Sequence, residues 1–245
     1  LENAKTIDIA KLSWLNRNKR HQGFGEFVLE DLSDNNVSFI IDLNGSVDNY
    51  SGTLFARAHE LNLSSWINEF TGLDRQLASS KGNVEVWAQI ENGDINRVDG
   101  KLLPSTFEWA TEQTIINNTI DAQFAGIKRD QKWDIAISNL HIQTQDNSLT
   151  TNITGYIDTL NGAVVRIAEP LSIKPLLSLS ALFSVDMADK LVMTSADAQL
   201  LELTALINEN GLTLDAKFDG INWQEHNEIT GIEDLQARLF WQGKR

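Results

Sequence analysis

The clearest pattern in the sequence is that of GLTLDAKFD, residues 211–219. Its apolar members are Leu212, Leu214, Ala216 and Phe218, and the residues between them are Thr213, Asp215 and Lys217. Successive side chains of a β-strand point to opposite faces, so this period of two predicts a strand with one apolar and one polar face. The question for the rest of the chain is whether other segments repeat the pattern.

Six further segments repeat the alternation, at 37–43, 84–90, 120–124, 133–137, 149–157 and 235–241. Their apolar positions include Val37, Phe39, Ile41, Leu43, Val84, Val86, Ala88, Ile90, Ile120, Phe124, Ile135, Ile137, Ile153, Ile157, Leu235, Ala237 and Leu239. Together with the 211–219 stretch, these residues are the candidate lining of a shared apolar surface.

Turn signals separate the segments at intervals of about ten residues, which is typical of antiparallel hairpins. They are Asn44-Gly45, Asn92-Gly93, Asp99-Gly100, Asn161-Gly162, Asn210-Gly211 and Asp219-Gly220. Helix signals are short: a serine cap begins one at 64–72, and Pro175 favours another through Ser184. The predicted fold class is therefore mainly β, an elongated antiparallel sheet with a few short helices.

Domain organisation follows from what separates the segments. No Pro-rich or Gly/Ser-rich linker divides residues 1–245, so we expect a single unit. Similar hexapeptides at 7–12, 61–66 and 171–176 suggest repeats of about 55 residues. The chain begins Leu-Glu-Asn without a signal segment, which favours a piece of a longer protein.

Composition excludes several function classes. The 20 basic and 34 acidic residues give a net charge of −14, which argues against nucleic acid and anionic membrane surfaces as partners. There is no cysteine, so disulfides and thiolate chemistry are excluded. No apolar run is long enough for a membrane-spanning helix.

Catalytic and metal-binding motifs are missing from the sequence. The four histidines lie far apart, and no phosphate-binding loop or nucleophile elbow is present, so we expect no metal, no cofactor and no catalytic residue. Adjacent acids such as Glu233 and Asp234 are expected by chance among so many carboxylates. A glycan-cleaving enzyme with paired acids and tryptophan platforms is the least favoured alternative.

Something must shield the apolar faces of so many amphipathic strands. Two such faces can meet in a closed sandwich or solenoid that binds protein or glycan through surface aromatics. Alternatively, a curved sheet keeps an open apolar groove for a ligand. A 16-carbon acyl chain buried there would contribute on the order of 10 kcal/mol at about 0.8 kcal/mol per methylene.

Three segments resemble the YhdP-type branch of the AsmA-like proteins of Gram-negative bacteria. They are GNVEVW at 82–87 leading into ENG at 91–93, LNLSSW at 61–66, and NEITGIEDLQARL at 227–239. The resemblance covers most of the chain and implies a repeating β-groove, a taco-shaped sheet whose apolar groove shields phospholipid acyl chains.

The same resemblance implies a place and a role. It implies non-enzymatic phospholipid transport between inner and outer membranes, in the periplasm. It also implies that the rest of the full-length protein, including an inner-membrane anchor, is a partner of this segment. The residues themselves identify neither the lipid nor the direction of transport.

Overall fold

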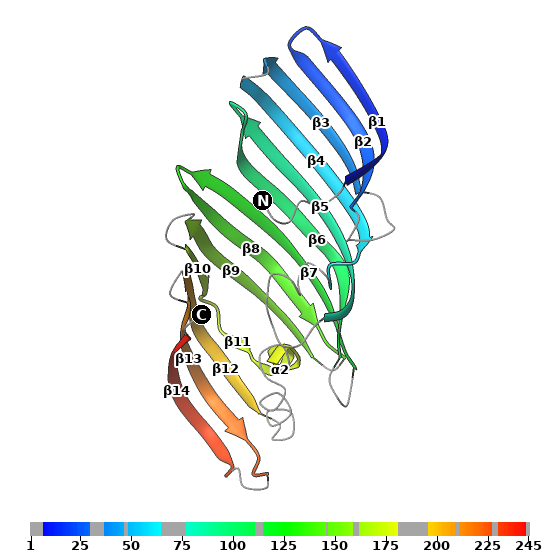
Figure 1. The fold of residues 1–245 in the computed structure, drawn as a ribbon. Coiled ribbons are helices and arrows are strands. Elements are labelled where there is room, and N and C mark those ends of the chain that lie inside the picture. Colours follow the sequence, from blue (N-terminus) through cyan, green and yellow to red (C-terminus); the bar gives the residue numbers. More distant parts are fainter. Residues whose placement is uncertain are drawn as a thin grey trace.

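The strands form one antiparallel sheet in the computed structural model, which describes residues 7–29, 37–46, 49–64, 77–110, 115–145, 147–158, 162–180, 196–208, 211–226 and 230–243 (Figure 1). The strands are β1 (Ile7–Arg17), β2 (Arg20–Leu29), β3 (Val37–Ser46), β4 (Asn49–Leu61), β5 (Leu77–Glu91), β6 (Asp94–Ala110), β7 (Ile115–Arg129), β8 (Lys132–Gln143), β9 (Ser148–Asp158), β10 (Gly162–Ile167), β11 (Leu171–Ser172), β12 (Asp197–Asn208), β13 (Gly211–Trp223) and β14 (Ile232–Gly243). One short helix, α2 (Lys174–Ser180), lies among the described residues.

The strand order is a simple meander. Each strand pairs with the next one along the chain, except that β10 pairs with β12 while the two-residue β11 pairs with β12 off this path. The sheet is long and curved, with β1 and β14 at its two ends (Figure 1). The predicted fold class is confirmed, and the described strands form one sheet instead of two facing ones.

The two long edges of the sheet differ. Short turns join β1–β2, β3–β4, β5–β6, β7–β8, β9–β10 and β12–β13 at what we call the tight-turn edge. The strand ends that flank the other connections, among them the longest at 62–76 and 173–196, lie at the opposite edge, which we call the long-connection edge. This follows from the meander, because alternate turns of an up-and-down sheet lie at alternate edges.

The amount of exposed surface shows that the sheet does not close on itself. The accessible surface is 15771 Å², whereas a compact monomer of this mass exposes about 11,000 Å². Exposed large apolar side chains include Trp14, Leu239 and Trp241, at 50%, 49% and 46%.

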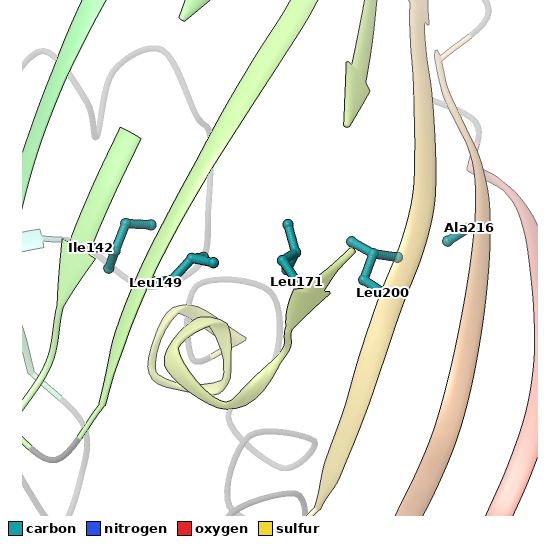
Figure 2. Packing of buried hydrophobic residues seen from close by; sticks show 5 residues of the cluster. All are labelled: Ile142, Leu149, Leu171, Leu200 and Ala216. Atoms are coloured by element: carbon teal, nitrogen blue, oxygen red, sulfur yellow. The ribbon is translucent and has the colours of Figure 1, made fainter. Parts of the chain in front are cut away.

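Burial is concentrated at the long-connection edge. One cluster comprises Ile142, Leu149, Leu171, Leu200 and Ala216, drawn from β8, β9, β11, β12 and β13 (Figure 2). Leu176 of α2 packs against this cluster, so α2 covers that part of the sheet. A second cluster joins Val37, Ala58 and Leu61, with Phe27 and Leu63 packed against it.

The helix prediction is confirmed in part. Pro175 lies at the second residue of α2, where its fixed φ suits a first turn. Residues 181–184, the expected continuation, lie outside the described residues, as does most of the expected helix at 64–72.

Three of the six predicted turn signals lie inside strands. Asn44 and Gly45 lie in β3, paired with Ser51 and Tyr50 of β4. Asp99 and Gly100 lie inside β6, paired with Ala125 and Phe124. Gly220, at φ 58°, lies at an irregularity within β13, between Phe218 and Ile221, instead of ending a strand. Asn92-Gly93 does form the β5–β6 turn, with both residues at positive φ.

Candidate functional site

The pairing register builds an uninterrupted apolar row across the whole sheet. Directly paired residues of neighbouring antiparallel strands point to the same face, so a chain of pairs traces one row. The first row reads Trp14, Gly23, Ile41, Leu54, Ala88, Val98, Gly126, Ile135, Gly155, Val165, Ala205, Leu214, Trp241. It contains no polar side chain.

A second row runs beside the first. On each strand it lies two residues from the first row, on the side of the long-connection edge. It reads Leu12, Gly25, Phe39, Ala56, Val86, Gly100, Phe124, Ile137, Ile153, and then Ile167, Leu203, Ala216, Leu239. We call the surface carrying both rows the apolar face and its open part the trough. Twelve strand-to-strand steps of about 4.8 Å make the trough about 58 Å long.

All the candidate lining residues predicted from the sequence lie on this apolar face. Most are half-buried, while Ile157, Leu235 and Leu239 are exposed. Val37 and Ala216 belong to the covered clusters, and Ile120 and Phe218 pack against one of them. The open trough therefore excludes these four positions, which lie toward the long-connection edge.

Aromatic rings lie over glycines along the trough. A Cβ built on Gly100 would lie 2.1 Å from the Phe124 ring, and one on Gly23 would lie 2.5 Å from the Trp14 ring. Trp133 approaches Gly126 in the same way, at 3.2 Å. The glycines leave room for the rings to lie against the strands, an arrangement known to protect sheet glycines. Large side chains thus cover the floor without closing the trough.

The trough deepens into a hollow over β6 to β9. This hollow has a volume of about 520 Å³. Its lining is apolar throughout: Val98, Phe124, Ala125, Gly126, Trp133, Ile135, Ala136, Ile137 and Ile157. Small-molecule sites typically have volumes of about 300–1,000 Å³ and mostly apolar walls.

Sequence reasoning missed much of β4 and β6. Leu54 and Ala56 of β4 and Val98 and Leu102 of β6 lie on the apolar face but were not among the predicted residues. In β6 the alternation is interrupted by register shifts near Ile95 and between Leu102 and Ser105. The glycines of these strands could have revealed the pattern, because they alternate in step with the apolar residues instead of lying in turns.

The polar face carries paired charges. Arg20 binds Asp42 through two hydrogen bonds, of 2.9 and 2.6 Å, and Arg238 binds Asp215 through two of 2.8 and 2.6 Å. These hydrogen bonds lower the pKa of both carboxyl groups below the usual value. A general acid needs a raised pKa, so these carboxylates are poorly suited to that role.

The polar face also has an apolar ridge on β2 to β5. Phe24, Ile40, Phe55 and Trp87 are directly paired across β2 to β5, on the face opposite the trough. The rings of Phe55 and Trp87 lie 5.1 Å apart, and Lys101 lies 5.8 Å from the Trp87 ring.

The described residues contain no cluster of three or more potential metal ligands of the His, Asp or Glu type. Within the same ranges, no helix has the length and apolar character needed to cross a bilayer.

Comparison with known proteins identifies a family. A family model described as YhdP protein matches residues 2–244. No curated protein and no solved structure matches the chain. The matched family is a transport-type family of the bacterial envelope, and its members indicate a lipid-transfer role in general terms.

Proposed function

The chain belongs to the YhdP family, and from that premise we propose that the trough binds phospholipid acyl chains and conducts them between the inner and outer membranes, without catalysis. The observation that carries this proposal is the first row, an apolar line that crosses every strand of the main path. A row of this length offers a continuous path instead of a single pocket.

Exposure supports a ligand that is itself apolar. Monomeric soluble proteins rarely expose apolar patches of more than a few hundred Å², and larger ones mark binding surfaces. Here the exposed Trp14 and Trp241 lie at the two ends of one row. An acyl chain lying along the row would remove that surface from water, at about 0.8 kcal/mol per methylene.

The open side of the trough supports transfer as well as storage. The clusters that cover the apolar face lie toward the long-connection edge, so the first row remains accessible along the tight-turn side. No wall encloses a lipid bound there, so the lipid can enter and leave the trough from the open side. Periplasmic location, phospholipid as cargo and cooperation with the rest of the full-length protein are parts of the same proposal.

A pair of neighbouring substitutions tests it. Ile137 lines the 520 Å³ hollow, whereas Ser138 is exposed on the opposite face of the same strand. We expect Ile137→Asp to reduce copurified and photocrosslinked phospholipid about tenfold or more, because a buried carboxylate lacks a partner there. Native mass spectrometry of the purified chain measures the bound lipid.

The matched control is Ser138→Asp, which adds the same charge to the polar face. Phospholipid retention should equal that of the unmodified chain. Equal retention by Ile137→Asp and Ser138→Asp, or no phospholipid on the unmodified chain, would overturn the proposal.

A further inference from the structure

An amphipathic lipid needs a place for its polar end as well as for its acyl chains. At the long-connection edge the apolar face is covered by the two clusters, and Leu176 of α2 packs on one of them. At the tight-turn edge the last inward-facing residues beside the hollow are exposed or half-exposed, as at Ile157. A headgroup therefore has access to water at the tight-turn edge.

Lys128 lies at that edge, next to the hollow. It pairs directly with Trp133, which pairs with Ile157, and both of these residues line the hollow. Lys128 is two residues beyond Gly126, so its side chain is on the apolar face. It is the charged residue that the register places on this face of β7, because Asp121 and Arg129 have the opposite parity.

The surroundings of Lys128 leave its charge available. Its Nζ lies 3.6 Å from the Oδ2 of Asp94, a carboxylate that is 78% exposed, so the ion pair is long and open to water. Exposed pairs of this kind contribute little and exchange partners readily. The Lys128 side chain itself is 33% exposed, so a ligand in the hollow can reach it.

Asn96 adds an unused acceptor at the same place. It precedes Arg97, the residue paired with Ile127, so on β6 it stands opposite Lys128 on β7. Its Oδ1 is shielded from solvent and accepts no hydrogen bond. Shielded polar atoms without partners are uncommon and costly, so this oxygen is suited to a donor supplied by a ligand.

We propose that Lys128 and Asn96 form a headgroup site at the mouth of the hollow, where Lys128 binds the phosphate of a glycerophospholipid and Asn96 accepts a hydrogen bond from its polar headgroup. This inference rests on the proposed function. A phosphate contact of this type is a charge-assisted hydrogen bond, and the neighbouring Asp94 suits a headgroup that also carries an ammonium.

Displacement of a fluorescent acyl probe from the 245-residue chain tests the site. The competitors are phosphatidylethanolamine and diacylglycerol with identical acyl chains, and inorganic phosphate alone. We expect phosphatidylethanolamine to compete about tenfold better than diacylglycerol, the size of one charge-assisted contact. Lys128→Gln should abolish this preference without weakening diacylglycerol binding, and Lys128→Arg should retain it.

Arg129→Gln is the matched control, because Arg129 is the next residue, faces the other side and forms its own ion pair with Asp134 at 2.9 Å. It should leave the preference unchanged. An unmodified chain that binds both lipids equally, or displacement by inorganic phosphate alone, would overturn the headgroup site but not the trough. Failure of both lipids to displace the probe would instead contradict the proposed function.

Discussion

The tight-turn edge and the long-connection edge are built from the same strands, yet one leaves the apolar face open and the other covers it. At the long-connection edge, Leu176 and Leu63 come from connections long enough to pack back against the clusters of the sheet. A turn of two or three residues cannot do this, because it is fully used in reversing the chain. Connection length therefore decides where the apolar face meets water.

The largest expected effect is on the free energy of unfolding, and it distinguishes two leucines of the same sheet. Leu200 is 4% exposed on β12, where it pairs with Leu171 of β11, whereas Leu239 is 49% exposed on β14. Leu200→Ala should lower the free energy of unfolding by about 3 kcal/mol, since it removes a buried side chain and leaves a cavity. Leu239→Ala should cost less than about 1 kcal/mol.

Denaturant titration of both variants gives the two free energies. Similar losses for Leu200→Ala and Leu239→Ala would mean that the two edges do not differ in packing. A smaller loss for Leu239→Ala supports the view that residues of the trough are kept for a ligand instead of for stability.

A second prediction concerns the contact between Gly100 and the Phe124 ring in the open trough. Gly100→Val should force the Phe124 ring off the strand and into the trough, because even a Cβ would lie 2.1 Å from that ring. We expect stability to fall by about 1–3 kcal/mol through overpacking, together with a loss of lipid binding. Thermal unfolding and lipid copurification measure the two effects.

The double variant Gly100→Val, Phe124→Ala serves as the test of this mechanism. Removal of the ring makes room for the valine, so the two substitutions should be strongly non-additive. Additive losses of stability would show that the valine is rejected by something other than the Phe124 ring.

The smallest effect concerns the polar face. Hydrogen bonds from Arg238 lower the pKa of Asp215 in the folded chain. The stabilisation from this pair is therefore present above the usual carboxyl pKa of about 3.9 and is lost as the pH falls through the lowered folded pKa. Arg238→Gln should lower the melting temperature at pH 7 by about 1 °C, in line with exposed pairs.

Melting curves across the acid range check the sign. The melting temperatures of Arg238→Gln and the unmodified chain should converge at low pH, once Asp215 is protonated in both. A difference that grows toward low pH would contradict the assignment.

The sequence predicted the strands well because alternation is a local property. The 211–219 stretch and the 235–241 segment both lie in strands with the expected parity. The wrong turn at Asp99-Gly100 arose because glycine has two uses in a sheet, and only the partner strand, with Phe124, reveals which one applies.

The covered clusters could not be predicted, because they join residues far apart in the chain. Leu149 and Leu200 meet only through β11, and no period in the sequence signals such a contact. The proposed headgroup site was missed for a similar reason, since Lys128 and Asn96 come from different strands and match no motif. The suggested repeats of about 55 residues stay a prediction: 7–12 lies entirely within β1, whereas Leu61 ends β4 and Leu171 begins β11.

The apolar rows run across the strands. Each hairpin therefore adds to the length of the trough and does not change its width. Adding a hairpin would lengthen such a conduit by about 10 Å while leaving its width unchanged. The length and the width of the trough are thus set independently in this architecture. The number of hairpins sets the length, and the number of residues in each strand sets the width.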